Sequence, residues 1–265
     1  MRRLLTFGCE GATLGATLDA GGGKTGLVMV TGGSQTRVGS HRMYERLAKS
    51  LAERGIACLR YDRRGVGDSA SEDPGFRGSA PDLAAAAACL RSENPGVERV
   101  HGFGLCDGAT AIALFGDQAG LDGLILVNPW LVEAASGEPP PAAIRRHYRE
   151  RLLTLAGWRR ILSGAVDYRK LLSGIRKIVR PVPPSSLAAE VAAALARHQL
   201  PTRLILAAGD ATAITAESEL KSSTFKGLVD AAQRIDSDSH TFARPGDEAA
   251  LLGAVLKAVQ LLENR

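Results

Sequence analysis

The chain has 265 residues, of which 45% are hydrophobic and 23% are charged, and its formal net charge is +5. This length suits one sizeable α/β domain with its own core, and the composition excludes a disordered or fibrous protein. Because no apolar run reaches the roughly 18 residues of a membrane span, and the run after Met1 is too short for a signal peptide, we expect a cytoplasmic protein.

Strand-like and helix-like patterns alternate along the chain. The N-terminal segment Leu4–Leu18 indicates a hairpin that adds an antiparallel edge. Strands are then predicted at Leu27–Val30, Ala57–Tyr61, Val100–Phe103, Leu124–Val127, Leu204–Leu206 and Gln233–Ile235. Helices are predicted at Tyr44–Ala52, Asp82–Leu90, Ala109–Phe115 and Glu248–Leu262. Such alternation is typical of a parallel sheet with helices on both faces.

Residues 131–200 interrupt this alternation. They contain no convincing strand, and their helical segments are punctuated by glycines and by the break Pro181-Val182-Pro183-Pro184. The strand pattern resumes only at Leu204. We therefore predict a core made of residues 1–130 and 201–265, with residues 131–200 inserted as a helical cap.

Two glycine-rich segments imitate nucleotide-binding motifs. Gly21-Gly22-Gly23-Lys24-Thr25 ends like a phosphate-binding loop, but Leu18 stands where that motif begins with glycine, and a strand follows instead of a helix. Gly102–Asp107 follows a strand as a dinucleotide fingerprint does, but Asp107 occupies the third glycine position. No cluster of His, Cys and Asp has the spacing of metal ligands. We therefore expect neither a cofactor nor a metal.

The segment Gly104-Leu105-Cys106-Asp107-Gly108 fits a nucleophile elbow, with cysteine in the place that serine usually takes. Glycines two residues before and after the nucleophile allow the strand-to-helix turn to close and to present the side chain at the sheet edge. The start of a helix also favours the reactive thiolate. The other cysteines, Cys9, Cys58 and Cys89, lack CxxC spacing and are expected to be buried reduced thiols.

A thiol nucleophile needs a base, and the base needs an orienting carboxylate. Among the five histidines, His240 lies late in the chain, in the loop before the last predicted helix. Asp210 follows the strand Leu204–Leu206 and is the predicted acid, with Asp236 and Asp238 as competitors. The remaining histidines are interpreted as structural or surface residues.

The oxyanion of an acyl-transfer intermediate needs backbone donors close to the nucleophile. One is predicted to be the amide of Asp107, the residue after Cys106. The second should come from the loop after an earlier strand, Gly32-Gly33-Ser34-Gln35, and Ser34 is the predicted donor.

Several motifs together resemble a known family. Tyr61–Ser69 is similar to the D-x-R-G-x-G-x-S turn of α/β-hydrolases. With Gly33–Arg42, the Cys106 elbow and Asp210–Ala213, the chain resembles family 1 of the hydrolases associated with the exosortase A system. This resemblance covers most of the chain, and it implies an α/β-hydrolase fold and a link to bacterial exopolysaccharide production and protein sorting. It does not imply a particular substrate.

The positive charge of the chain is concentrated in the predicted cap. Residues 145–180 hold eleven Lys and Arg against two acidic residues, a formal charge of +9 within a chain of +5. Arg145, Arg146 and Arg149 are the predicted substrate-binding residues. Three interpretations stay open: a solvated face, a site for an anionic or carrier-linked acyl substrate, and peripheral contact with an anionic membrane. The chain shows no nucleic-acid-binding module, so we expect no nucleic-acid partner.

The predicted activity is that of a Cys-His-Asp hydrolase acting on a small activated ester or thioester through an acyl-enzyme. An acyltransferase would use the same intermediate, with an alcohol in place of water. The rival interpretation is a scaffold of the same fold that binds a partner without catalysis.

Overall fold

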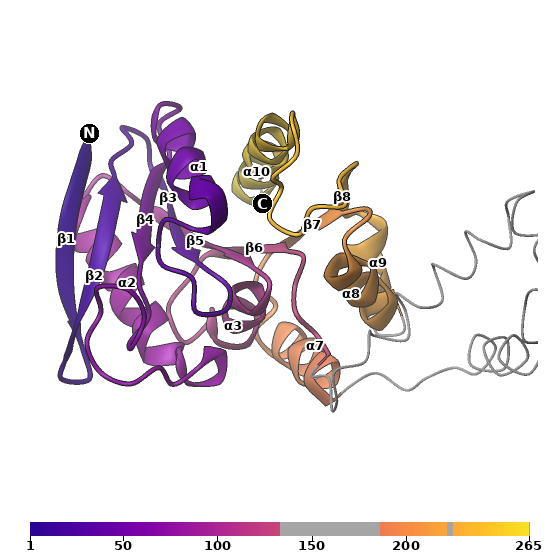
Figure 1. Ribbon diagram of the computed structural model, residues 1–265, viewed down its shortest axis with the longest axis horizontal. Coiled ribbons are helices and arrows are strands. Elements are labelled where there is room, and N and C mark those ends of the chain that lie inside the picture. Colours follow the sequence, from indigo (N-terminus) through magenta and orange to yellow (C-terminus); the bar gives the residue numbers. More distant parts are fainter. Residues whose placement is uncertain (133–185, 222–224, 265) are drawn as a thin grey trace, which may run out of the picture.

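The computed structural model describes residues 1–132, 186–221 and 225–264. They form an eight-stranded sheet in the order β1-β2-β4-β3-β5-β6-β7-β8, shown in Figure 1. The strands are β1 (Arg2–Cys9), β2 (Ala12–Asp19), β3 (Thr25–Val30), β4 (Ala57–Tyr61), β5 (Arg99–Leu105), β6 (Gly123–Val127), β7 (Thr202–Ala207) and β8 (Gln233–Ile235). Strands β3 to β8 pair in parallel, whereas β2 pairs antiparallel with both β1 and β4. The predicted parallel sheet with an antiparallel hairpin at its edge is confirmed.

Helices cover both faces of the sheet (Figure 1). One face carries α1 (Met43–Ala52) and α10 (Asp247–Glu263). The other carries α2 (Ala80–Glu93), α3 (Asp107–Phe115), α7 (Ser186–His198), α8 (Ala211–Lys221) and α9 (Lys226–Asp230). In the described part of the chain, two short 3-10 helices, η1 (Ser40–Arg42) and η2 (Phe76–Gly78), lie in the connections.

Strand β3 shows how two cores arise from one sheet. All six of its residues are buried, because a central strand of a parallel sheet is covered on both faces. Val28 and Val30 point into the core beneath α2 and α3, whereas Leu27 and Met29 point into the core beneath α1 and α10. Successive side chains alternate between faces, so a continuous apolar run serves both layers.

Helix α7 lies within the range predicted as the cap, yet it packs on the core. Leu187, Ala188 and Val191 of α7 belong to the same buried cluster as Ile112 of α3. Residues 133–185, which include most of the predicted insertion, lie outside the described residues. The cap assignment stays a prediction for that segment, while α7 is a covering helix of the sheet.

The turn after β4 is held by a buried carboxylate. Asp62 is fully buried and accepts hydrogen bonds from the amide of Arg37 at 2.5 Å and the amide of Asp68 at 3.0 Å. The Arg37 guanidinium pairs with both Asp62 and Asp68. A buried charge needs such partners to be tolerated. The network ties the loop after β4 to the loop after β3, which lies against the elbow at Gly32.

Candidate active site

The predicted nucleophile stands where β5 turns into α3. Cys106 is half-buried, and its backbone has φ 60° and ψ −127°, a region that a non-glycine residue enters at a cost of about 1–3 kcal/mol. The close approach explains the flanking glycines. A Cβ at Gly104 would lie 2.5 Å from the carbonyl of Gly108, and one at Gly108 would collide with the carbonyl of Val30. The chain can therefore turn this sharply only with glycine at both places.

The strained turn is held by backbone hydrogen bonds to the neighbouring strands. The amide of Cys106 donates to the carbonyl of Val127 at 3.1 Å, and the carbonyl of Cys106 accepts from the amide of Trp130 at 3.1 Å. Below the elbow, the buried Tyr44 hydroxyl donates to the carbonyl of Val30 and accepts from the amide of Leu105. These bonds offset the backbone strain and place the sulfur at the carboxyl edge of the sheet.

The structure brings His240 and Asp210 together beside Cys106. Nδ1 of His240 lies 3.0 Å from Oδ2 of Asp210, and Cys106 is close enough to the imidazole to raise its pKa. Asp210 is buried and accepts a second hydrogen bond from the amide of Ala213 at 2.9 Å. The competing carboxylates Asp236 and Asp238 are exposed. The three predicted residues thus form one chain of contacts from thiol to imidazole to carboxylate.

Asn128 positions the histidine loop, a role that sequence reasoning missed. Its side chain is fully buried at the end of β6, in a residue with φ 41°. The amide nitrogen of the side chain donates to the carbonyl of His240 at 3.0 Å, and the side-chain oxygen accepts from the amide of Ala207 at 2.8 Å. One side chain therefore ties His240 to β7. The available signal was its place directly after a buried strand, where parallel-sheet enzymes carry functional residues.

The electrostatics of this chain favour a charged histidine. Burial alone lowers the pKa of His240, but the hydrogen bonds to Asp210 and Cys106 and their negative charge outweigh it and raise the pKa from 6.5 to about 10. His240 then carries its proton at neutral pH. An imidazolium in this place can donate a proton to a group that leaves beside Cys106.

The loop after β3 supplies an amide that faces the elbow. Gly33, with φ 57°, donates its amide hydrogen to the Asp107 side chain at 2.6 Å. The next peptide group is also fixed by a hydrogen bond, because the buried guanidinium of Arg63 donates to the carbonyl of Gly33 at 2.6 Å. Ser34, the predicted second oxyanion donor, is exposed on the same loop. Its assignment stays a prediction, and the geometry adds Gly33 as the amide directed at the elbow.

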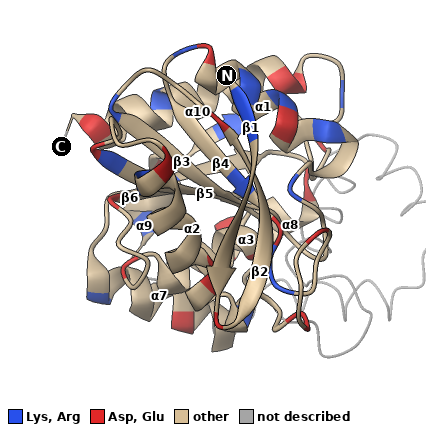
Figure 2. Cartoon of the chain, turned by 90° about the vertical axis from the view of Figure 1, so that its left-hand side faces the viewer, with Lys and Arg blue, Asp and Glu red and all other residues tan. Residues whose placement is uncertain are grey.

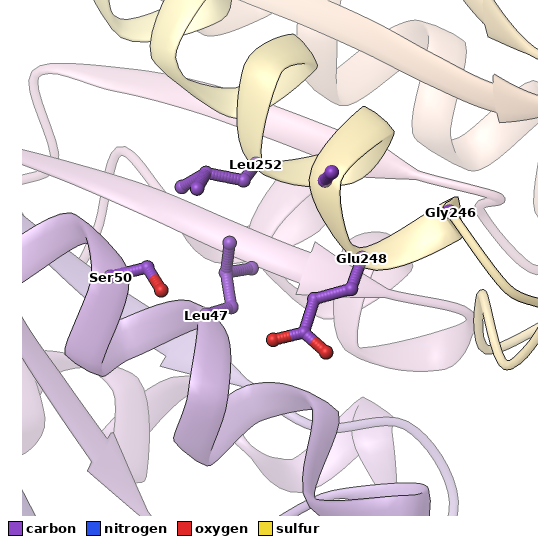
Figure 3. A pocket seen from close by; sticks show the side chains of 6 residues that line it. Leu47, Ser50, Gly246, Glu248 and Leu252 are labelled. Atoms are coloured by element: carbon purple, nitrogen blue, oxygen red, sulfur yellow. The ribbon is translucent and has the colours of Figure 1, made fainter.

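Other features of the described residues lie apart from this constellation. The pocket in Figure 3 lies between α1 and α10, is lined by Leu47, Leu252 and neighbouring residues, and includes none of the three predicted catalytic residues. Among the described residues, no group of three or more His, Cys, Asp or Glu could hold a metal ion. No described helix has the length and apolar character needed to cross a bilayer. Arg145, Arg146 and Arg149 lie outside the described residues.

Comparisons with known proteins agree with this architecture. Residues 25–245 match the model of the family described as "Serine aminopeptidase, S33", and no curated protein matches the chain. An esterase from Pyrococcus furiosus is similar at a TM-score of 0.65 and 14% identity, over 99% of this chain and 91% of that one. An α/β hydrolase from Penicillium sp. sh18 is similar at 0.63 and 20%, over 98% of both chains.

A further similar structure is the thioesterase domain from the curacin biosynthetic pathway, with a TM-score of 0.58 and 15% identity. It covers 97% of this chain and 99% of that domain. At such low identity these similarities establish the fold, while the chemistry has to be argued from the residues of this chain.

Proposed function

The chain belongs to the α/β-hydrolase family described as serine aminopeptidase, S33, and from this premise we propose that it hydrolyses activated esters or thioesters with Cys106 as its nucleophile. The observation that supports this proposal is the contact chain from Cys106 through His240 to Asp210 at the ends of three strands. A scaffold without catalysis has no need of a strained elbow aligned with such a pair.

The first half of the proposed reaction forms an acyl-enzyme. His240, held by Asp210, takes the proton of Cys106, and the thiolate attacks the carbonyl carbon. The carbonyl electrons move to oxygen, where backbone amides of Asp107 and of Gly33 or Ser34 stabilise the oxyanion. When the carbonyl re-forms, the bond to the leaving alkoxide or thiolate breaks. The leaving group takes the proton of the His240 imidazolium, so a thioester on Cys106 and a neutral imidazole remain.

The second half releases the acyl group. Neutral His240 takes a proton from water as the water oxygen attacks the thioester carbonyl. Collapse of this intermediate expels the Cys106 thiolate, yields the carboxylic acid and restores the imidazolium. An alcohol that takes the place of water leaves with the acyl group and makes the same acyl-enzyme an acyltransferase. Asp210 holds the imidazole and stabilises its charge throughout.

The substrate side of the proposal uses the charge distribution. In the described part, the charges on α1 are interspersed and paired, as between Arg46 and Glu248 and between Lys49 and Glu53 (Figure 2). The excess positive charge lies in residues 145–180. We propose that Arg145, Arg146 and Arg149 attract an anionic or carrier-linked leaving group, since a cluster of positive charge raises the local concentration of such ligands.

The biological setting is proposed from sequence resemblance. The Arg37–Arg42 segment and the Cys106 elbow resemble the exosortase-associated hydrolases. On that basis we propose a cytoplasmic enzyme that serves exopolysaccharide metabolism.

Steady-state turnover of para-nitrophenyl butyrate tests the proposed nucleophile. Cys106→Ala should abolish turnover with the fold intact, because the elbow depends on its glycines and not on the sulfur. The half-buried Cys89, on α2, provides the matched control. Cys89→Ala should keep wild-type turnover, whereas substantial turnover by Cys106→Ala would place the nucleophile elsewhere.

A further inference from the structure

The side chain of Asp107 is hydrogen-bonded to the loop amide that faces the elbow. Its Oδ1 accepts the Gly33 amide hydrogen at 2.6 Å. The same oxygen lies 2.9 Å from the point where a Cβ at Gly32 would stand, and Cβ of Cys106 lies 2.8 Å from that point. The carboxylate of Asp107 and the side chain of Cys106 therefore both lie close to Gly32.

This carboxylate is not neutralised by an ion pair within the described residues, where its hydrogen-bond partner is the Gly33 amide. The nearby Arg63 guanidinium lies behind the loop, where it contacts the carbonyl of Gly33 and lies 3.6 Å from Asp73. Asp107 is also the first residue of α3, where a negative charge is favourable for a helix. Helix stability alone does not require the carboxylate to reach across to another loop.

We propose that Asp107 determines specificity through its side chain: it competes with the substrate carbonyl for the Gly33 amide and repels acyl groups that carry negative charge beside that carbonyl. The inference rests on the proposed acyl-enzyme chemistry and defines its substrate class. A neutral acyl chain has only to displace the carboxylate from one amide. An anionic chain on Cys106 must also approach a like charge on the adjacent, half-buried residue, which is unfavourable.

The proposal therefore assigns a neutral acyl group to the favoured substrate.

A matched pair of substrates separates these effects. Propionyl and malonyl thioesters of N-acetylcysteamine differ only in a methyl group against a carboxylate, and both release the same neutral thiol. The ratio of their kcat/KM values is measured for wild type and for Asp107→Asn, which keeps an acceptor for the Gly33 amide and removes the charge. We expect wild type to prefer the propionyl thioester, and this preference to fall at least about tenfold in Asp107→Asn.

Two further variants exclude trivial explanations. Asp107→Glu keeps the charge and should keep the preference. Glu98→Gln removes one negative charge at the opposite end of the parallel strands, where Glu98 pairs with Lys24, and should leave the ratio unchanged. An unchanged ratio in Asp107→Asn, or an equal loss of preference in Asp107→Glu, would overturn the proposal. Thermal melting of each variant shows whether a change in ratio accompanies a loss of fold.

The same samples show which proposal fails. Intact-protein mass spectrometry can show that the propionyl thioester acylates Cys106 of wild type. If it does, but the ratio of the two kcat/KM values is the same in the Asp107 variants, only the specificity proposal is wrong. If Cys106 is never acylated by either thioester, the acyl-enzyme proposal is wrong and the role of Asp107 is overturned with it.

Discussion

Alanine at Gly104 tests whether the elbow depends on close backbone contact. The added Cβ would lie 2.5 Å from the carbonyl carbon and oxygen of Gly108 and 2.6 Å from the amide nitrogen of Ala109. Two carbon atoms in ordinary contact are at least about 3.5 Å apart, so the start of α3 has to move by about 1 Å. These obstructing atoms are backbone and cannot rotate away. Overpacking of this kind costs about 1–3 kcal/mol, and a misplacement of about 1 Å at a reacting group costs about a hundredfold in rate.

Gly102, two residues earlier on β5, is the matched control. A Cβ there would meet the end of the Leu121 side chain at 2.8 Å and Ile112 side-chain atoms at 3.4 Å. Because the nearest of these atoms is the end of the Leu121 side chain, which can rotate away, Gly102→Ala should destabilise the protein less than Gly104→Ala and keep its activity. Urea unfolding and kcat/KM for para-nitrophenyl butyrate measure both effects. If Gly104→Ala were as stable and active as Gly102→Ala, the account of the elbow would be refuted.

Three other predictions concern buried charge. Arg63→Met should change the free energy of unfolding by no more than about 2 kcal/mol. It removes a buried guanidinium whose Nη1 has no partner among the described residues, and with it the bond to Gly33. It should still lower kcat several-fold; a large loss of stability with full activity would contradict this. Asp210→Asn should lower the pKa of His240 from about 10, as an NMR titration of the imidazole would show. An unchanged pKa would exclude the pairing of His240 with Asp210. Burial lowers the pKa of His101 below 6.5, so the unfolded chain binds the proton more readily and stability should fall as pH decreases below about 6.5. His101→Leu should reduce this fall in the free energy of unfolding at acid pH, as urea unfolding would show. An unchanged pH dependence would mean that other groups cause it.

The sheet was predictable because its central strands are buried on both faces. The run Leu124–Val127 lies within β6, and Ala57–Tyr61 coincides with β4. Strand β3 begins earlier than predicted, at Thr25, because Thr25 and Gly26 pair with β5 although neither extends the apolar run. Helix α8 was not predicted, since its amphipathic pattern is weak and its buried residues are small, as Ala213 and Ala216 show.

The candidate site was predictable where a residue follows a strand directly. Cys106 and Asp210 were found in this way, and His240 by its place before the last helix. The contact of Asp107 with Gly33 was not predictable, because it depends on a left-handed backbone in a loop far away in the sequence. Loop conformations of this kind follow from tertiary packing, and no local pattern of residues specifies them.

The most direct test of the central claim is a mass measurement on the protein itself. Wild type is mixed with para-nitrophenyl butyrate, quenched in acid within the first turnovers and analysed intact, and then as peptides. The account predicts one butyryl group per chain, located on Cys106 and absent from Cys106→Ala. An acyl group on any other residue would contradict the account. So would release of para-nitrophenol without any acyl-enzyme, both in wild type and in a His240→Ala variant that slows deacylation.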